Sequence, residues 1–314
     1  MSGTGLLSFL HCTLHAELNL MWRKTTIPKF ERPRVGLALS GGAARGVAHV
    51  GVLKVFVEQG VPIDCIAGTS AGALVGGAFA AGMSIAELEE LGHHLRWRDM
   101  GKMTLSRLGI QSNARMEDYV RAHFPVLRFE QLSVPFAAVA TDLQSGKAVV
   151  MSGEGDLAFA IRASCALPGW YVPVVDAEGR QLIDGGLVAN IPSAAARALG
   201  AEIVVAVDVN AGGAAFLGPP QSVIGVLLQS IILVQRTAAT HQRQIADVVI
   251  SPKVGHIRWD EMARGAELLA AGEEAAREVI DHIKLLLNPP PELPVPPRRS
   301  LLSRLRRDKQ PVHS

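Results

Sequence analysis

Two apolar strands, each ended by a glycine-containing turn and followed by a helix, constrain the fold of this chain more than any other feature. The strands are predicted over residues 34–40 and 63–69, and the helices over residues 44–60 and 70–81. Strands that alternate with helices favour a parallel sheet with helices on both faces. We therefore expect a three-layer α/β/α sandwich with a mainly parallel central sheet.

The rest of the chain continues this alternation. Ser84 and Glu87 have the spacing of a capping box, so a helix is expected to begin at Ile85. A hairpin is expected to turn at residues 176–179 and to lead into a strand from residue 181. Further strands are predicted over residues 134–143, 146–152, 202–209 and 247–251, and further helices over residues 156–166, 193–200, 220–244 and 260–287.

Composition excludes several classes of protein. The 314 residues are 48% hydrophobic and 19% charged, and their formal net charge is only +2. This net charge does not indicate a nucleic-acid-binding protein. The three cysteines, Cys12, Cys65 and Cys165, are far apart and match no metal-binding or disulfide spacing. We therefore expect neither a metal site nor a disulfide, and a reducing compartment such as the cytosol.

The sequence divides into three parts: an N-terminal extension (1–33), one α/β domain (34–287) and a tail (288–314) that is proline-rich and then basic. In the extension, basic residues follow the apolar stretch instead of preceding it, so no signal peptide is expected. The apolar stretch 223–234 is too short to cross a bilayer. These features predict a cytoplasmic protein, and the basic tail leaves peripheral membrane contact open.

The second turn carries a motif that can display a nucleophile. Gly68, Ser70 and Gly72 have the spacing G-x-S-x-G between a predicted strand and a predicted helix. In such an elbow the serine backbone is strained, and the two glycines let the strand and the helix approach closely. Packing of small residues at an ordinary turn is the alternative interpretation, so the motif alone leaves the role of Ser70 open.

The first turn, "SGGAARG" from Ser40 to Gly46, opens a helix with several consecutive backbone amides and predicts an anion site. A phosphate-binding Walker loop is excluded because no Lys-Ser/Thr pair follows Gly46. A dinucleotide fingerprint is disfavoured because Ala43 replaces its middle glycine. Asp64, moreover, stands at the start of the second strand and not at its end. Beside a nucleophile, amides of this kind serve as an oxyanion hole.

A serine nucleophile needs a base, and the sequence offers two kinds. Asp184 ends a short predicted strand just before Gly185 and Gly186, although an aspartate that merely starts a turn is an equal alternative. A Ser-Asp-His triad is also compatible with the residue order, because His241, His256 and His282 lie downstream. The position of Ser70 after only the second strand argues against that triad. His49, His93 and His94 are interpreted as helix-surface residues.

In this order, "SGGAARG", "GTSAG" and "DGG" resemble the patatin-like phospholipase family, and the resemblance extends over residues 34–285. It implies a serine lipid acyl hydrolase with a Ser-Asp dyad and no catalytic histidine. Ser70 would be the nucleophile and Asp184 the general base, without metal or organic cofactor. The oxyanion amides would be those of Gly41, Gly42 and Ala43, where the family usually has a third glycine, and Arg45 and Gly46 would complete the motif.

This resemblance implies a fatty acyl ester as substrate: a phospholipid, a lysophospholipid or a neutral lipid. The apolar stretch 223–234 is a candidate lining for an acyl channel, or else an ordinary buried helix. A carboxylate is a weak base for a serine unless it is desolvated, so Asp184 is expected in a partly apolar pocket. Two other functions stay open: a catalytically weak lipid-binding protein on the same scaffold and, more remotely, a dinucleotide-binding oxidoreductase.

Overall fold

A computed structural model describes residues 32–212 and 220–288. Nearly all of the expected N-terminal extension and of the expected basic tail lies outside the described residues. The central sheet has eight strands. Seven of them follow the order β11-β10-β1-β2-β5-β9-β8, and β6 pairs with the edge of β5 opposite β2 and β9. Their bounds are β1 (Val35–Leu39), β2 (Cys65–Thr69), β5 (Phe136–Asp142), β6 (Ala148–Ser152), β8 (Val174–Val175), β9 (Gln181–Asp184), β10 (Ile203–Val207) and β11 (Val248–Ile250).

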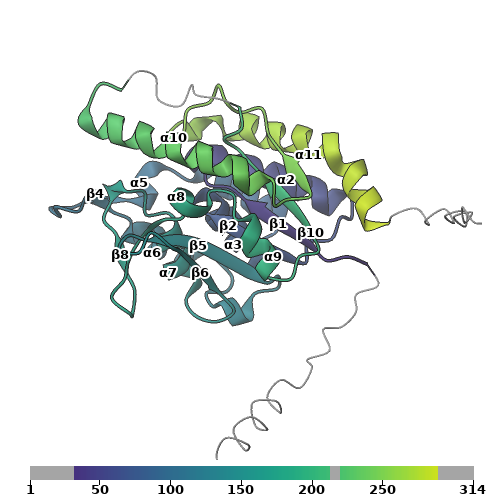
Figure 1. Cartoon of the computed structure of the whole chain (residues 1–314), viewed down its shortest axis with the longest axis horizontal. Coiled ribbons are helices and arrows are strands. Elements are labelled where there is room, and N and C mark those ends of the chain that lie inside the picture. The colour runs from purple at the N-terminus through teal and green to yellow at the C-terminus, as the bar shows by residue number, and fades with distance from the viewer. Residues whose placement is uncertain (1–31, 213–219, 289–314) are drawn as a thin grey trace, which may run out of the picture.

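Helices cover both faces of this sheet (Figure 1), and the expected three-layer α/β/α sandwich is confirmed. Strands β11, β10, β1, β2 and β5 are mutually parallel, whereas β6, β8 and β9 pair antiparallel. The helices are η1 (Ala43–Val47), α2 (Ala48–Glu58), α3 (Ala71–Ala80), α4 (Ile85–His94), α5 (Trp97–Met100), α6 (Ala114–His123), η2 (Phe129–Gln131), α7 (Leu157–Ser164), α8 (Gly186–Ala189), α9 (Ser193–Ala198), α10 (Val223–Arg243), η3 (Met262–Arg264) and α11 (Gly265–Leu287).

The two faces of the sheet bury different side chains because residues alternate along each strand. In β1, Val35, Leu37 and Leu39 join the larger core, which packs against α2, α3, α7 and α11. Ala38 lies on the opposite face, in a smaller core of mostly alanine and valine beside α9 and α10. The small side chains on that face let α9 pack closely on the sheet.

A small second sheet joins β3 (Lys102–Met103), β4 (Gly109–Ser112) and β7 (Gly169–Tyr171). Its strands have two to four residues, which are too few to show a periodic pattern of hydrophobic residues. For this reason the sequence does not predict them. The capping box that begins α4 is confirmed: Glu87 donates its amide to the Ser84 hydroxyl, and the Glu87 carboxylate accepts the Ser84 amide.

The sheet brings the ends of two strands together at one point. Strand β6 occupies one edge of β5 from Ala137 to Thr141, so β2 and β9 share the other edge. Strand β2 runs parallel to β5 and ends with Thr69 opposite Val139. Strand β9 runs antiparallel and ends with Asp184 opposite Ala140, the next residue. The carboxyl ends of β2 and β9 therefore meet, which brings the turn after Thr69 next to Asp184.

Candidate active site

Ser70 stands on a strained turn between β2 and α3. Its backbone angles are φ 53° and ψ −121°, and a positive φ is rare for a residue with a side chain. A Cβ on Gly68 would lie 2.4 Å from the Gly72 carbonyl oxygen, and one on Gly72 would lie 2.2 Å from the Leu39 carbonyl oxygen. Both positions of the motif therefore require glycine, and the geometry is that of a nucleophile elbow.

Ser164 holds this turn in place from the end of α7. The amide of Ser70 donates to the Ser164 hydroxyl at 2.9 Å, and that hydroxyl donates to the Val139 carbonyl at 2.6 Å. Ser164 is fully buried, so this chain of two bonds is protected from water. No sequence signal marks this role beyond a serine within a stretch of small residues.

Asp184 is buried at the end of β9, with 3% of its surface exposed. Its carboxylate accepts the Gly186 amide at 2.7 Å, and the Ser70 side chain lies within hydrogen-bonding reach of it. Burial raises the pKa of Asp184 to about 6, although these two interactions act in the opposite direction. The desolvated carboxylate expected from the sequence is therefore present, and it contacts Ser70 directly.

The close packing of the "DGG" segment fixes this position of Asp184. A Cβ on Gly185 would lie 2.2 Å from the Val139 carbonyl oxygen, and one on Gly186 would lie 2.5 Å from Gln235 Nε2. The contact at Gly185 is with backbone, so a larger residue there would have to displace the backbone beside Asp184. Thr141 adds a hydrogen bond of 2.9 Å from its hydroxyl to the Asp184 carbonyl.

The glycine loop before η1 lies against the same serine. A Cβ on Gly41 would be 3.2 Å from Ser70 Cβ. The Gly41 amide donates to the Asn190 carbonyl at 3.1 Å, and Asn210 Nδ2 donates to the Gly41 carbonyl at 2.7 Å. Within the described part of the chain no acceptor pairs with the amides of Gly42 and Ala43. Of the three amides expected to donate to an oxyanion, the Gly41 amide already has an acceptor, whereas the amides of Gly42 and Ala43 remain available.

Ala43 adopts φ 50° in this loop, which a glycine would adopt without strain. We expect Ala43→Gly to raise the free energy of unfolding by roughly 0.5 kcal/mol, because relief of about 1 kcal/mol of strain exceeds the added entropy of the unfolded chain. Urea unfolding measures this change. Ala44→Gly is the control, because it removes a buried methyl group from η1 and should destabilise the protein. Equal destabilisation by both variants would contradict this account of Ala43.

Arg45 anchors the loop to the segment before η3 and does not act as a free cation. Its fully buried side chain donates to the carbonyls of Ile257 at 2.7 Å and Gly255 at 3.1 Å. Burial lowers the pKa of Arg45 to about 10, so it stays charged at neutral pH. A Cβ on Gly46 would lie 2.4 Å from Ala71 Cβ, which shows how closely the loop packs on the residue after Ser70.

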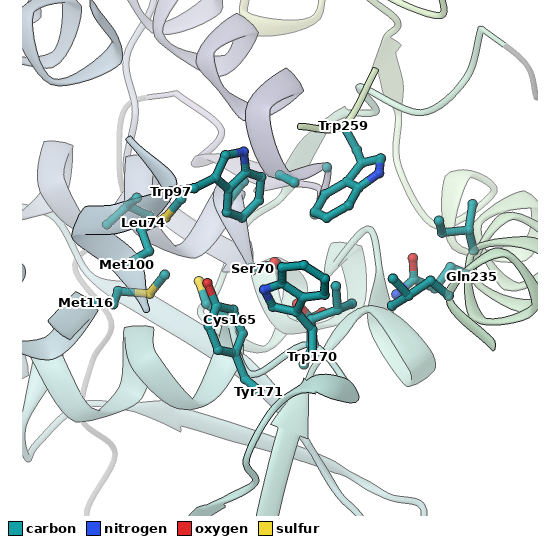
Figure 2. Close-up of a pocket in the computed structure, with 18 of the residues that line it drawn as sticks. Ser70, Leu74, Trp97, Met100, Met116, Cys165, Trp170, Tyr171, Gln235 and Trp259 are labelled. Atoms are coloured by element: carbon teal, nitrogen blue, oxygen red, sulfur yellow. The ribbon is translucent and has the colours of Figure 1, made fainter. Parts of the chain in front are cut away.

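A cavity opens above Ser70 and Asp184, and its walls are mostly apolar. It encloses about 930 Å³, open solvent at its mouth included. Trp259 meets Trp97 and Trp170 edge to face, with ring centroids 5.1 and 6.1 Å apart. Figure 2 shows these three rings around Ser70, with Met100 and Met116 on one side of the cavity and Gln235 on the other. The lining also includes Leu74, Leu95, Cys165, Leu167, Tyr171, Leu228, Ile232 and Met262.

Cys165 lies beside Ser70 in this cavity (Figure 2). Burial raises the pKa of its thiol, and the negative charge of Asp184 raises it further. The side chain therefore stays a neutral thiol and acts as part of the wall. Cys65 is also a free cysteine, and no group of metal-ligating residues occurs within residues 32–212 and 220–288.

None of the histidines within residues 32–212 and 220–288 lines the cavity. His241, His256 and His282 are exposed, and His256 pairs with Glu267 at 2.7 Å. His93 and His94 are exposed on α4, as expected. The surface position expected for His49 is wrong: it is fully buried in α2, where its Nε2 lies 2.8 Å from the Ser40 carbonyl oxygen. Burial lowers the pKa of His49 to about 4, so the ring is neutral.

Helix α10 contains the apolar stretch 223–234 and closes one side of the cavity. Leu228 and Ile232 line the cavity, whereas Val223, Leu227 and Val234 are more than half exposed. The stretch is therefore a partly exposed wall and not a buried helix. In the described portions of the chain, no helix combines the length and the apolar character needed to cross a bilayer.

The fold and this site define an α/β protein with a serine elbow and an adjacent buried aspartate. The family model for patatin-like phospholipases matches residues 37–197, just over half of the chain. The protein belongs to the patatin-like phospholipase family.

Two kinds of relative are similar in sequence. An uncharacterized NTE family protein of Mycobacterium bovis is 41% identical over 187 residues, which cover 57% of this chain and 49% of that protein. Patatin-like phospholipase domain-containing protein 7 of Rattus norvegicus is 34% identical over 184 residues, 56% of this chain and 13% of that protein. The matched region thus spans about half of the mycobacterial relative and a small part of the rat protein.

Among solved structures, VipD from Legionella pneumophila has a similar fold. It superposes with a TM-score of 0.52 at 15% identity, over 80% of this chain and 67% of that chain. At this level of identity the similarity concerns the fold alone.

Proposed function

We propose that the protein is a serine hydrolase of lipid acyl esters that acts through a dyad of Ser70 and Asp184. Membership in the patatin-like phospholipase family supports a lipid hydrolase. The observation that carries the finer proposal is the position of Ser70, on a strained turn and within hydrogen-bonding reach of the buried Asp184, at the floor of an apolar cavity. No histidine among the described residues lines that cavity, so the carboxylate is the base within reach.

The proposed reaction has two acyl-transfer steps. Asp184 accepts the hydroxyl proton as Ser70 attacks the ester carbonyl, and the amides of Gly42 and Ala43 donate to the oxyanion. Collapse of the tetrahedral intermediate breaks the ester bond, and protonated Asp184 gives its proton to the departing alcohol. Water, deprotonated by Asp184, then attacks the acyl-serine. As the second tetrahedral intermediate collapses, protonated Asp184 returns its proton to the Ser70 oxygen, which releases the fatty acid and the free enzyme. Ser70, Asp184 and water therefore account for every proton transfer in these two steps.

The apolar lining supports a fatty acyl group as the part of the substrate that enters the cavity. Phospholipase A and lysophospholipase activities both fit this proposal, because each cleaves a fatty acyl ester.

The test is turnover of p-nitrophenyl esters of graded chain length, for which we expect kcat/KM to rise from acetate to octanoate as more methylene groups are buried. No turnover of any ester would favour the other candidate, a lipid-binding protein on the same scaffold.

The raised pKa of Asp184 predicts how activity depends on pH. Only the carboxylate accepts the Ser70 proton, so kcat/KM should be constant at alkaline pH and fall tenfold per pH unit below about 6. An unburied aspartate would keep its activity down to about pH 4. Initial rates with p-nitrophenyl butyrate from pH 4.5 to 9 measure the midpoint. Rates that stay nearly constant down to pH 4.5 would show that Asp184 is not the desolvated base.

Exposed apolar side chains on the cavity side of the molecule support peripheral contact with a membrane. Leu105 is fully exposed and Leu108 is 58% exposed, both between β3 and β4, with Lys102 and Arg107 nearby in the sequence. The small sheet connects this hairpin to Trp170 of the cavity wall through β7.

We expect the double variant Leu105→Asp/Leu108→Asp to lose co-sedimentation with anionic vesicles, and unaltered co-sedimentation would contradict the contact.

A further inference from the structure

A second cavity adjoins the catalytic one and has a different character. It lies between α10 and the carboxyl end of β10. The two cavities share four wall residues, Asn190, Asn210, Ile232 and Gln235, so they lie next to each other. Beyond this shared wall the lining is largely polar, with Asp208, Ala211, Leu233, Arg236, Thr237, Ala239, Thr240 and Arg243.

Three polar side chains at the junction have no partner. Asn190 is 2% exposed, and Gln235 and Arg236 are half-buried. Over residues 32–212 and 220–288 none of these three side chains has a hydrogen bond or an ion pair. The Asn190 side chain is almost enclosed by the protein, and native structures normally satisfy such an amide. Gln235 and Arg236 are half-buried and keep access to solvent, so their donors are available to a polar ligand that enters this cavity.

The charges of this second cavity favour an anion. Arg243 is neutralised by Asp208, to which it donates from both Nε and Nη2. Arg236 has no such carboxylate, so its charge remains uncompensated among the lining residues. It also lies close enough to Arg45 for the two positive charges to repel. A bound anion would relieve this repulsion, and a guanidinium with neighbouring amide donors matches the oxygen atoms of a phosphate.

The position of this second cavity determines which part of a lipid reaches it. Met100 and Met116 lie on one side of Ser70 and Gln235 lies on the other (Figure 2), so an apolar end with the two methionines lies opposite an end where Gln235 adds a polar group to Leu228 and Ile232. A fatty acyl chain gains most from the apolar end. With the ester carbonyl at Ser70, the alcohol part of the substrate then points toward Gln235 and Arg236.

We propose that this polar cavity binds the phosphate of a glycerophospholipid, with Arg236 as its main anchor and Asn190 and Gln235 as additional donors. The inference rests on the proposed function and refines its substrate class, because it favours phospholipids over neutral lipids. In a glycerophospholipid the phosphate is separated from an acyl ester by only a few bonds of the glycerol. One molecule can therefore reach the second cavity and Ser70 together.

The test compares two lipids with the same acyl chains, phosphatidylcholine and diacylglycerol, in micelles of a neutral detergent. For Arg236→Gln we expect the ratio of kcat/KM for phosphatidylcholine to that for diacylglycerol to fall at least tenfold, mainly through KM. Arg236→Lys should restore part of the ratio. Arg277→Gln, an exposed arginine of α11, is the control and should keep the wild-type ratio. An unchanged ratio in Arg236→Gln would overturn the proposal.

A binding measurement separates this inference from the proposed chemistry. Calorimetry with Ser70→Ala and Ser70→Ala/Arg236→Gln, titrated with dihexanoyl phosphatidylcholine as a monomer, does not depend on turnover. We expect the second variant to bind at least tenfold more weakly, and equal affinities would overturn the subsite even if the enzyme is active. Inorganic phosphate is titrated in parallel. Arg236-dependent binding of inorganic phosphate without any effect on the lipid would also overturn the headgroup assignment.

Discussion

Ser70→Ala is expected to lower kcat/KM for p-nitrophenyl butyrate by a factor of about 10,000 or more, because no other group replaces an activated nucleophile. The substitution removes one oxygen atom from a half-buried position, and the bond from the Ser70 amide to Ser164 is independent of the side chain. The variant should therefore unfold at the same temperature as the wild type, as followed by circular dichroism.

Ser230→Ala is the matched control for this substitution. Ser230 is an exposed serine of α10 that donates to the Val226 carbonyl, so its loss should leave kcat/KM within a factor of about two. If folded Ser70→Ala kept more than a tenth of the wild-type rate, another residue would carry the reaction.

Asp184→Asn is expected to lower kcat/KM by about 100- to 10,000-fold, because the amide cannot accept the Ser70 proton. The variant should also be more stable than the wild type at pH 8. Burial raises the pKa of Asp184 in the folded state above its value in the unfolded chain. Ionisation of this carboxyl therefore destabilises the folded protein as pH rises through about 6, and an uncharged asparagine avoids that cost. Kinetics and thermal unfolding at pH 8 measure both effects.

Asp142→Asn provides the control for this second substitution. Asp142 lies on β5, where its carboxylate accepts the Gln144 amide at 3.1 Å and the Ser145 hydroxyl at 2.5 Å. It does not line the cavity, so its loss should not change the rate of ester cleavage. Near-wild-type turnover by Asp184→Asn would assign the role of base elsewhere, and His256 and His241 would be tested next.

The elements that carry the site were predictable because their signals are local. The turn of Ser70 follows from a strand, two glycines at a fixed spacing and a helix, all within residues 63–81. The long-range encounter with Asp184 was not predictable from spacing. It depends on β2 and β9 sharing one edge of β5, and nothing in either segment specifies that pairing. The resemblance to the family predicted that Ser70 and Asp184 act together, and the sheet register explains why they lie close to each other.

The residues that were missed act through contacts between distant segments. Ser164 lies in α7 and Asn210 follows β10, yet both hold backbone groups of the two turns around the site. Neither residue type carries a sequence signal for such a role. His49 was misplaced because α2 is buried around nearly its whole circumference, so a polar residue in it need not mark an exposed face.

The most direct test of the central claim, that Asp184 activates Ser70, is covalent labelling by a fluorophosphonate ester, followed by mass spectrometry of the peptides. We expect one label per chain on Ser70 of the wild type, with the labelling rate reduced at least 100-fold in Asp184→Asn. A wild-type protein that stays unlabelled, or a label on any other residue, would contradict this claim.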